Sequence, residues 1–243
     1  MKSYLNSIII GTAVVLTAVI FANAFKNRNK ANDTITVTGL GSKDFISDLI
    51  VWRGSFETKN LDLREAYASL DRDRENIKKY LIAKGLKEEN VIFEAVNINK
   101  EYDYKYNEHG NRTSTTFTGY RLTQNLQIES NEVDNVENIS RKVSELINQG
   151  IEFHSNDPQY YYTKLAQLKL EMIAEATKDA NTRAKKIAEN AGSDIGRLKS
   201  ANMGVFQIIA QNSSEDYSYG GTFNTLAKRK TATITVRLEY ETD

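Results

Sequence analysis

The chain contains no cysteine, a single proline and only two histidines among its 243 residues. The lack of cysteine excludes disulfides, thiolate metal sites, a cysteine nucleophile and a lipidated cysteine of the lipoprotein type. A single proline argues against proline-rich linkers and for long uninterrupted elements. His109 and His154 have no histidine or carboxylate neighbour at the spacing of metal ligands. We therefore expect neither a metal site nor a bound cofactor.

Charge of one sign is also lacking, because 32 Lys and Arg residues balance 32 Asp and Glu residues. A neutral balance removes the usual electrostatic case for binding nucleic acid. No G-x-S-x-G motif is present, and most carboxylates lie on the polar faces of predicted helices. The sequence therefore predicts a protein that is not an enzyme. The alternative is a hydrolase built from scattered carboxylates and His154, which requires a pocket that converges on His154.

Long apolar runs are absent with one exception, residues 8–25, which are interrupted only by Gly, Thr and Asn. As a helix this run would extend about 27 Å, just enough to cross a hydrocarbon core. It is long for a signal peptide and is followed by basic residues, which favours an uncleaved membrane anchor over residues 1–30. The alternative is a signal peptide cleaved near Ala24, at the end of an A-x-A-like site. Residues 31–243 then form the folded domain.

Hydrophobic periodicity predicts an α+β fold for this domain, with a mainly antiparallel sheet and helices packed on one side. In the last predicted strand apolar and polar residues alternate cleanly up to Tyr240, which is typical of a sheet with one solvated face. The predicted strands cover residues 33–39, 48–58, 90–106, 115–130, 151–153, 198–209 and 230–240. The runs 90–106 and 115–130 are joined by a polar turn and predict a long antiparallel hairpin.

Three helices are predicted between these strands, at residues 61–84, 133–148 and 157–191. The last is the longest and carries a narrow alanine-rich stripe, which would let it lie close against a sheet. We expect Asp157 to be its N-cap, Pro158 to be its first helical residue and Gly192 to end it.

The segment Gly39-Leu40-Gly41-Ser42-Lys43 raises the question of a phosphate-binding loop. A dinucleotide fingerprint would need a third glycine at Asp44 and a helix immediately afterwards, whereas a strand-like run follows. A Walker motif would need glycine at Ser42. We therefore expect the two glycines to form a turn between two strands.

Tyrosines are clustered more than average and supply the predicted interaction surface. Tyrosine-rich strands and loops offer rigid, amphipathic contact area, so self-association into a homo-oligomer or contact with a partner is expected. The alternative is that they fill half-buried edges within one protomer. The residues are Tyr102, Tyr104, Tyr106, Tyr160, Tyr161, Tyr162, Tyr217 and Tyr219.

Three segments together resemble the SIMPL-domain family of exported bacterial proteins. They are the strand, Gly-x-Gly and following pair at residues 35–52, the run Gly119–Ile128, and the alanine-spaced helix that ends at Gly192. The family tends to have a Pro-Asp pair where Ser47-Asp48 stands here. The resemblance extends from about Asp33 to the C-terminus.

This resemblance implies an α+β domain in the periplasm or cell envelope, without recognised catalytic residues. Family members have been linked to oxidative-stress defence and to envelope antigens, and some form homo-oligomers. The resulting hypothesis is a non-enzymatic envelope domain, anchored in the inner membrane through residues 8–25 or soluble in the periplasm after cleavage, which acts by self-assembly or partner binding. A further alternative is a pore- or ring-forming oligomer in which the predicted hairpin joins a subunit contact.

Overall fold

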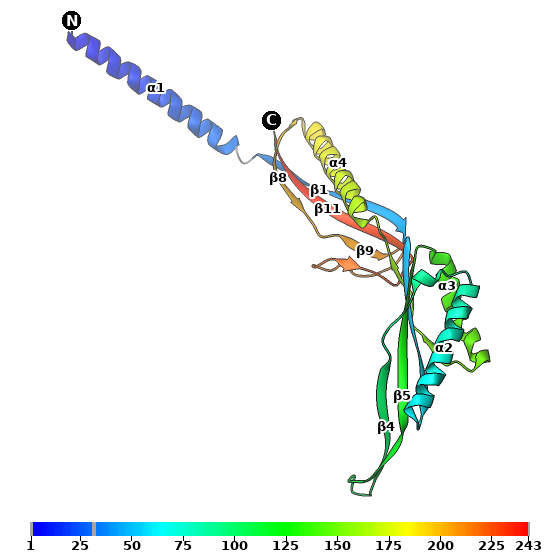
Figure 1. Cartoon of the computed structure of the whole chain (residues 1–243). Helices are drawn as coiled ribbons and strands as arrows, with labels where there is room; N and C mark the ends of the chain where they lie inside the picture. The colour runs from blue at the N-terminus through cyan, green and yellow to red at the C-terminus, as the bar shows by residue number, and fades with distance from the viewer. Residues whose placement is uncertain (1, 31–32, 243) are drawn as a thin grey trace.

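The computed structural model describes residues 2–30 and 33–242, and its elements confirm the α+β class (Figure 1). The helices are α1 (Lys2–Lys30), α2 (Leu63–Ala83), α3 (Val133–Lys142) and α4 (Leu165–Ala191), with short 3₁₀ helices at Glu88–Asn90 and Val143–Gln149. The strands are β1 (Thr34–Ile46), β2 (Leu49–Asn60), β3 (Val91–Phe93), β4 (Asn97–Tyr106), β5 (Arg112–Ser130), β6 (Phe153–Ser155), β7 (Gln159–Tyr161), β8 (Ile195–Met203), β9 (Gln207–Ala210), β10 (Thr222–Phe223) and β11 (Arg229–Thr242).

The strands divide between two sheets. The first sheet has the order β1-β11-β9-β10, with β8 also paired to β11. β1 and β11 are antiparallel over their whole length, from the pair Thr34 and Glu241 to the pair Ile46 and Arg229. Every second residue of β11 is buried, as the sequence alternation predicts, because α4 covers that face. The opposite face of the sheet carries the threonines of β1 and β11.

The glycines of the Gly-x-Gly segment do not form a turn, so that prediction is wrong. Gly39 and Gly41 lie within β1, opposite Val236 and Ile234 of β11. A Cβ atom at Gly39 would lie 2.1 Å from the carbonyl oxygen of Ala176 on α4. The glycines are therefore required by the close approach of the helix rather than by a change of chain direction. The chain changes direction between the sheets farther on, at residues 47–48.

The second sheet has the order β3-β5-β2-β6, with β4 also paired to β5 and β7 to β2. One face is covered by α2 and α3, whose apolar residues pack on Trp52 and Phe56 of β2. α2 begins where Asp62 caps the backbone amides of Arg64 and Glu65. The predicted hairpin is confirmed as the antiparallel pair β4 and β5, although β3 is a separate short strand before it.

The longest helix begins later than predicted. Asp157 and Pro158 do not open it, because residues 159–161 form β7, which pairs with residues 49–51 of β2. The local capping signal is therefore overridden by strand pairing. α4 starts at Leu165 and ends, as predicted, at Gly192, which has the left-handed φ of 77°.

α1 is a continuous helix of 29 residues that Figure 1 shows apart from both sheets. Its side chains from residue 10 to residue 25 are all exposed. None of the helices formed by residues 2–30 and 33–242 is both long and apolar enough to cross a membrane. The expectation of an anchor at residues 8–25 therefore stays a prediction.

Candidate functional site

A two-stranded arm projects from the second sheet and is its most exposed part. β5 is paired with β2 only as far as Tyr120, which lies opposite Asn60, and β4 is paired with β5 alone. We call residues 101–119 the arm, because here β4 and β5 have no strand neighbour except each other. Figure 1 shows the arm extending away from the first sheet, with its turn at the far end of the molecule. Residues 102–117 are all exposed.

A row of aromatic rings follows one face of the arm. The ring of Phe117 lies 5.2 Å from that of Tyr120 and 5.7 Å from that of Tyr102, and Tyr102 lies 6.5 Å from Tyr104. The Arg112 guanidinium lies 5.2 Å from the centre of the Tyr104 ring and continues the row. Phe117, Tyr102 and Tyr104 are 37%, 42% and 43% exposed. The rings thus hold one another in place and still present a large apolar surface.

Two bulges in β5 leave β4 regular. The pairing passes from Glu101 and Gly119 directly to Tyr102 and Phe117, so Thr118 has no partner in β4. A second shift occurs between Lys105 and Tyr106. Because successive side chains of a regular strand alternate between faces, Tyr102, Tyr104 and Tyr106 share one face of β4.

An ionic network fixes the base of the arm across three strands. Arg121 of β5 bonds to Glu101 of β4 and to Glu57 of β2, and Lys59 of β2 also pairs with Glu101. The hydrogen bond from Arg121, followed by that from Lys59, lowers the pKa of Glu101 to about 2. Exposed ion pairs are individually weak, but this network fixes the strand positions at the point where pairing with β2 ends. It therefore sets the direction of the arm.

Gly119 allows β5 to leave β2 at the base of the arm. Its φ is +136°, and a Cβ atom there would lie 2.7 Å from the carbonyl oxygen of Asn60. A residue with a side chain would therefore be strained and would push the strands apart. Sequence reasoning quoted this glycine only as part of a motif, and nothing in its neighbours reveals its positive φ.

The free edge of β1 in the first sheet, in contrast to the arm, is covered by α4. There the Leu40 amide donates a 2.9 Å hydrogen bond to Asp179 of α4, and Lys43 pairs with Glu171 at 2.6 Å. Covering an edge with a helix is a common protection against unwanted strand pairing. Residues 102–117 of the arm are, by contrast, all exposed. The arm edges are thus free to pair with another chain.

The other predicted tyrosines lie elsewhere. Tyr160 is buried in the core of the second sheet. Tyr161 packs on Phe223 at 6.4 Å, and Tyr162 packs against the core of the first sheet, 4.9 Å from Phe45. Tyr217 and Tyr219 are exposed in the loop that follows β9. The structure therefore places Tyr102, Tyr104 and Tyr106 together on the arm and adds Phe117 and Tyr120 to them, whereas Tyr217 and Tyr219 line a separate hollow with Leu40.

The site that the hydrolase alternative needs is not assembled around His154. This side chain is 58% exposed, and its neighbouring carboxylate, Glu152, is 3.7 Å away and 75% exposed. Within residues 2–30 and 33–242 no group of three or more possible metal ligands is formed either. His154 is a surface residue of a short edge strand.

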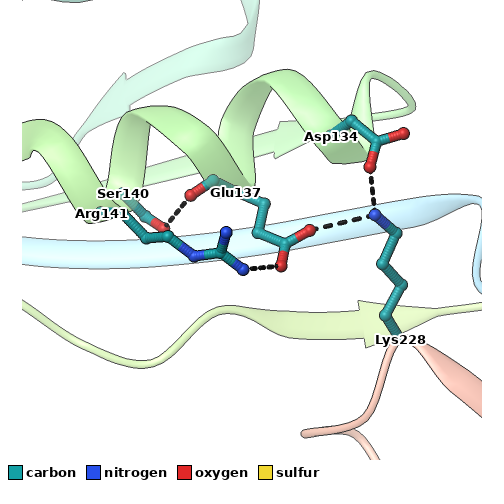
Figure 2. A network of polar contacts seen from close by, with 5 residues as sticks. All are labelled: Asp134, Glu137, Ser140, Arg141 and Lys228. Carbon is teal, nitrogen blue, oxygen red and sulfur yellow. Dashed lines mark hydrogen bonds and ion pairs between the residues drawn. The ribbon is translucent and has the colours of Figure 1, made fainter.

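A second polar cluster connects the two sheets. Figure 2 shows Lys228, from the loop before β11, bonded to Asp134 and Glu137 of α3, with Glu137 also bonded to Arg141. The Asp134 carboxylate raises the pKa of Lys228, and Lys228 lowers the pKa of Asp134. The ion pair of Lys228 and Asp134 therefore persists over a wide pH range.

Lys230, two residues farther on, is buried between the sheets and donates to the hydroxyl of Ser47 at 3.1 Å. These are the atoms of a Ser-Lys catalytic pair, but both side chains are almost completely buried, so a substrate would not reach the hydroxyl. Sequence reasoning missed Lys230, although its signal is present: it occupies an inward-facing position of the alternating strand β11.

The family model described as SIMPL, a protein of unknown function (DUF541), matches residues 35–240. The match therefore includes both sheets, the arm and the contacts between the sheets. No curated protein matches the chain.

Proposed function

This chain belongs to the SIMPL family, and we propose that it is a non-enzymatic module that pairs with a second copy of itself through the arm. The observation that supports this is the pair of uncovered strand edges in the arm, beside an ordered row of aromatic rings. An isolated two-stranded ribbon is only marginally stable in water, and an exposed edge offers unpaired N–H and C=O groups. Pairing with another edge satisfies these groups and covers the aromatic surface.

The charges of β4 favour one register for this pairing. Along a free strand edge the backbone N–H and C=O groups point outward at every second residue. In an antiparallel pair with a two-fold axis, an odd-numbered residue therefore lies opposite an odd-numbered residue, and an even-numbered residue opposite an even-numbered one. If the axis passes Tyr102, Glu101 lies opposite Asp103, and like charges repel. If it passes Asp103 or Lys105, that charge lies opposite itself. These registers are disfavoured.

A two-fold axis at Tyr104 removes the repulsion. Asp103 of each copy then lies opposite Lys105 of the other. On the other face, Tyr102 lies opposite Tyr106. Opposite charges and aromatic pairs at directly opposed positions each stabilise strand pairing. We therefore place the contact at the middle of β4, with Tyr104 on the axis.

The mass of the full chain in solution, measured by light scattering over a range of concentrations, tests the proposal. We expect an even multiple of the protomer mass for the parent chain. Tyr104→Ser should weaken the pairing, so that monomer is found at concentrations where the parent chain is still paired. Tyr219→Ser is the matched control, because Tyr219 is fully exposed but lies outside the arm. A wild-type monomer at all concentrations would exclude self-pairing. If the wild-type monomer instead binds another protein through the arm, the arm is a site for a different partner and self-pairing is excluded.

We also propose that α1 directs the domain to the cell envelope, as a membrane-associated segment or as a cleaved signal. The support is the exposed apolar surface of residues 10–25, which neither sheet covers. Fractionation of cells that express the full chain, and of cells that express it with Ile10, Val14 and Phe21 changed to Asn, tests this. Recovery of the unaltered chain in the cytoplasm, with its original N-terminus, would exclude it.

A further inference from the structure

The two sheets meet through polar contacts and the ring contact of Tyr161 with Phe223, and not through a common core. Each sheet has its own hydrophobic cluster, and the two clusters share no residue. The chain passes between the sheets twice, at residues 47–48 and at residues 162–164. These two crossings are bonded to each other, because Asp48 accepts hydrogen bonds from the amide and the hydroxyl of Thr163, both at 2.7 Å. We call the joint the two crossings together with the side chains of the two sheets that lie against them.

The centre of the joint holds a buried amine. Lys230 of β11 is 1% exposed, and its Nζ donates to the carbonyl oxygen of Tyr160 and to the hydroxyl of Ser47. The Phe223 ring lies 5.6 Å from the same nitrogen. Tyr160 belongs to the second sheet and Ser47 to a crossing, so Lys230 connects the first sheet to both. Its side chain cannot reach water unless the joint opens.

No carboxylate of the described residues pairs with this amine. Asp44 on β1 accepts hydrogen bonds from Thr231 and Gln211 instead, and Asp48 is bonded to Thr163. β9 and β10 carry no ionisable side chain. The remaining charged neighbours are engaged elsewhere or lie on the surface: Lys43 pairs with Glu171, Lys169 lies over Phe206, Lys228 pairs with α3, and Arg229 is exposed.

We infer that the joint is articulated, and that the buried ammonium group of Lys230 favours its opening, so that the angle between the sheets depends on pH. Contacts between two such units permit relative motion when they are polar and of limited extent. Burying a charge without an opposite partner is unfavourable, and opening the joint would return the ammonium to water. This inference is independent of self-pairing through the arm.

The direction of the pH effect follows from the two forms of the joint. Burial lowers the pKa of Lys230 to about 8 in the closed form. In the open form a solvated lysine has a pKa of about 10.5, so the open form binds the proton more strongly. Raising the pH from 8 toward 10 therefore favours the closed form. From pH 7 to 9.5 the closing equilibrium would increase on the order of 30-fold.

The ion pair beside the joint and the phenol of Tyr160 keep their charge states in this window. Lys228 has a raised pKa and Asp134 a lowered one, so their ion pair persists. Burial, together with Glu137, raises the pKa of the Tyr160 phenol above its ordinary value, so it stays neutral. We therefore assign the pH response of the joint to Lys230, whose pKa is lowered by burial.

A distance measurement between spin labels tests the inference directly. The absence of native cysteine allows Lys79→Cys on α2 and Lys185→Cys on α4 to carry the labels, since both positions are exposed. Labelled full chain is mixed with excess unlabelled chain, so that only distances within one protomer are recorded. At pH 7 we expect two distances between the labels, one from the closed joint and one from the open joint. At pH 9.5 the fraction of the open-joint distance should fall.

Two further variants separate the amine from general effects of pH. In Lys230→Met the distance distribution should no longer change with pH, whereas Lys178→Met, an exposed lysine of α4, should behave like the parent chain. One unchanged distance at both pH values in the parent chain would overturn the inference, whether or not Lys230→Met folds. A pH response that persists in folded Lys230→Met would overturn the role of Lys230.

Discussion

The backbone amide of Leu40 donates a hydrogen bond to the carboxylate of Asp179 at 2.9 Å, and so joins the free edge of β1 to α4. This bond is the main reason why the pKa of Asp179 is lowered. The free edge of β1 is thus covered by the molecule's own helix, whereas both edges of the arm are uncovered. The account of function rests on this difference.

Removing the carboxylate should expose the edge of β1. In Asp179→Ala the Leu40 amide loses its partner, and unpaired edge groups promote contact between sheets. We expect a lower midpoint of urea unfolding and larger particles in light scattering. Lys178→Ala, the adjacent exposed change on α4, should alter neither. An Asp179→Ala protein with unchanged midpoint and particle size would show that the edge is protected in another way.

Gly39→Ala should be strongly destabilising, because the new Cβ atom would meet backbone atoms of α4 at 2.1 Å and 2.4 Å. Backbone cannot move aside as a flexible side chain can, so α4 would have to shift away from β1. We expect a loss of about 3 kcal/mol or more in the free energy of unfolding. Gly220→Ala is the matched control, since nothing lies within 4 Å of a Cβ atom there.

Gly192 and Gly39 show what the sequence could and could not predict. Alternation in β11 identified its buried face, and Gly192 identified the end of α4, because both signals are local. The role of Gly39 depends on a helix that lies more than a hundred residues farther along the chain. The capping signal at Asp157 failed for a similar reason, since pairing with β2 decides the conformation of residues 159–161.

The arm itself was only half predictable. Two strand-like runs and a polar turn predict the hairpin, and the spacing of Tyr102, Tyr104 and Tyr106 places them on one face. Periodicity does not say where β2 stops accompanying β5, and that point alone decides which residues form a free ribbon. The contribution of Phe117 to the aromatic row depends on a bulge at Thr118, which the sequence does not mark.

The network at the base of the arm should resist acid. The pKa of Glu101 is lowered to about 2, so its bonds to Arg121 and Lys59 contribute fully above its ordinary pKa and are lost as the pH falls through about 2. A carboxyl NMR titration of Glu101 measures this. In Arg121→Met the midpoint should move up toward the ordinary value. A midpoint near 4.5 in the parent chain would mean that the network does not form in solution.

The central claim is that two copies pair along β4 with Tyr104 on the axis, and charge reversal tests it most directly by the mass of the full chain in solution. Asp103→Lys and Lys105→Asp should each place like charges opposite one another and give monomer at concentrations where the parent chain is paired. The double variant carrying both changes restores opposite charges and should pair again.

Lys185→Asp, an exposed change on α4, serves as the control for altered net charge and should leave pairing intact. Recovery of the paired mass in the double variant is the result that the account predicts. If both single variants keep the paired mass of the parent chain, or if the double variant remains a monomer, the copies do not meet in this register and the claim is contradicted.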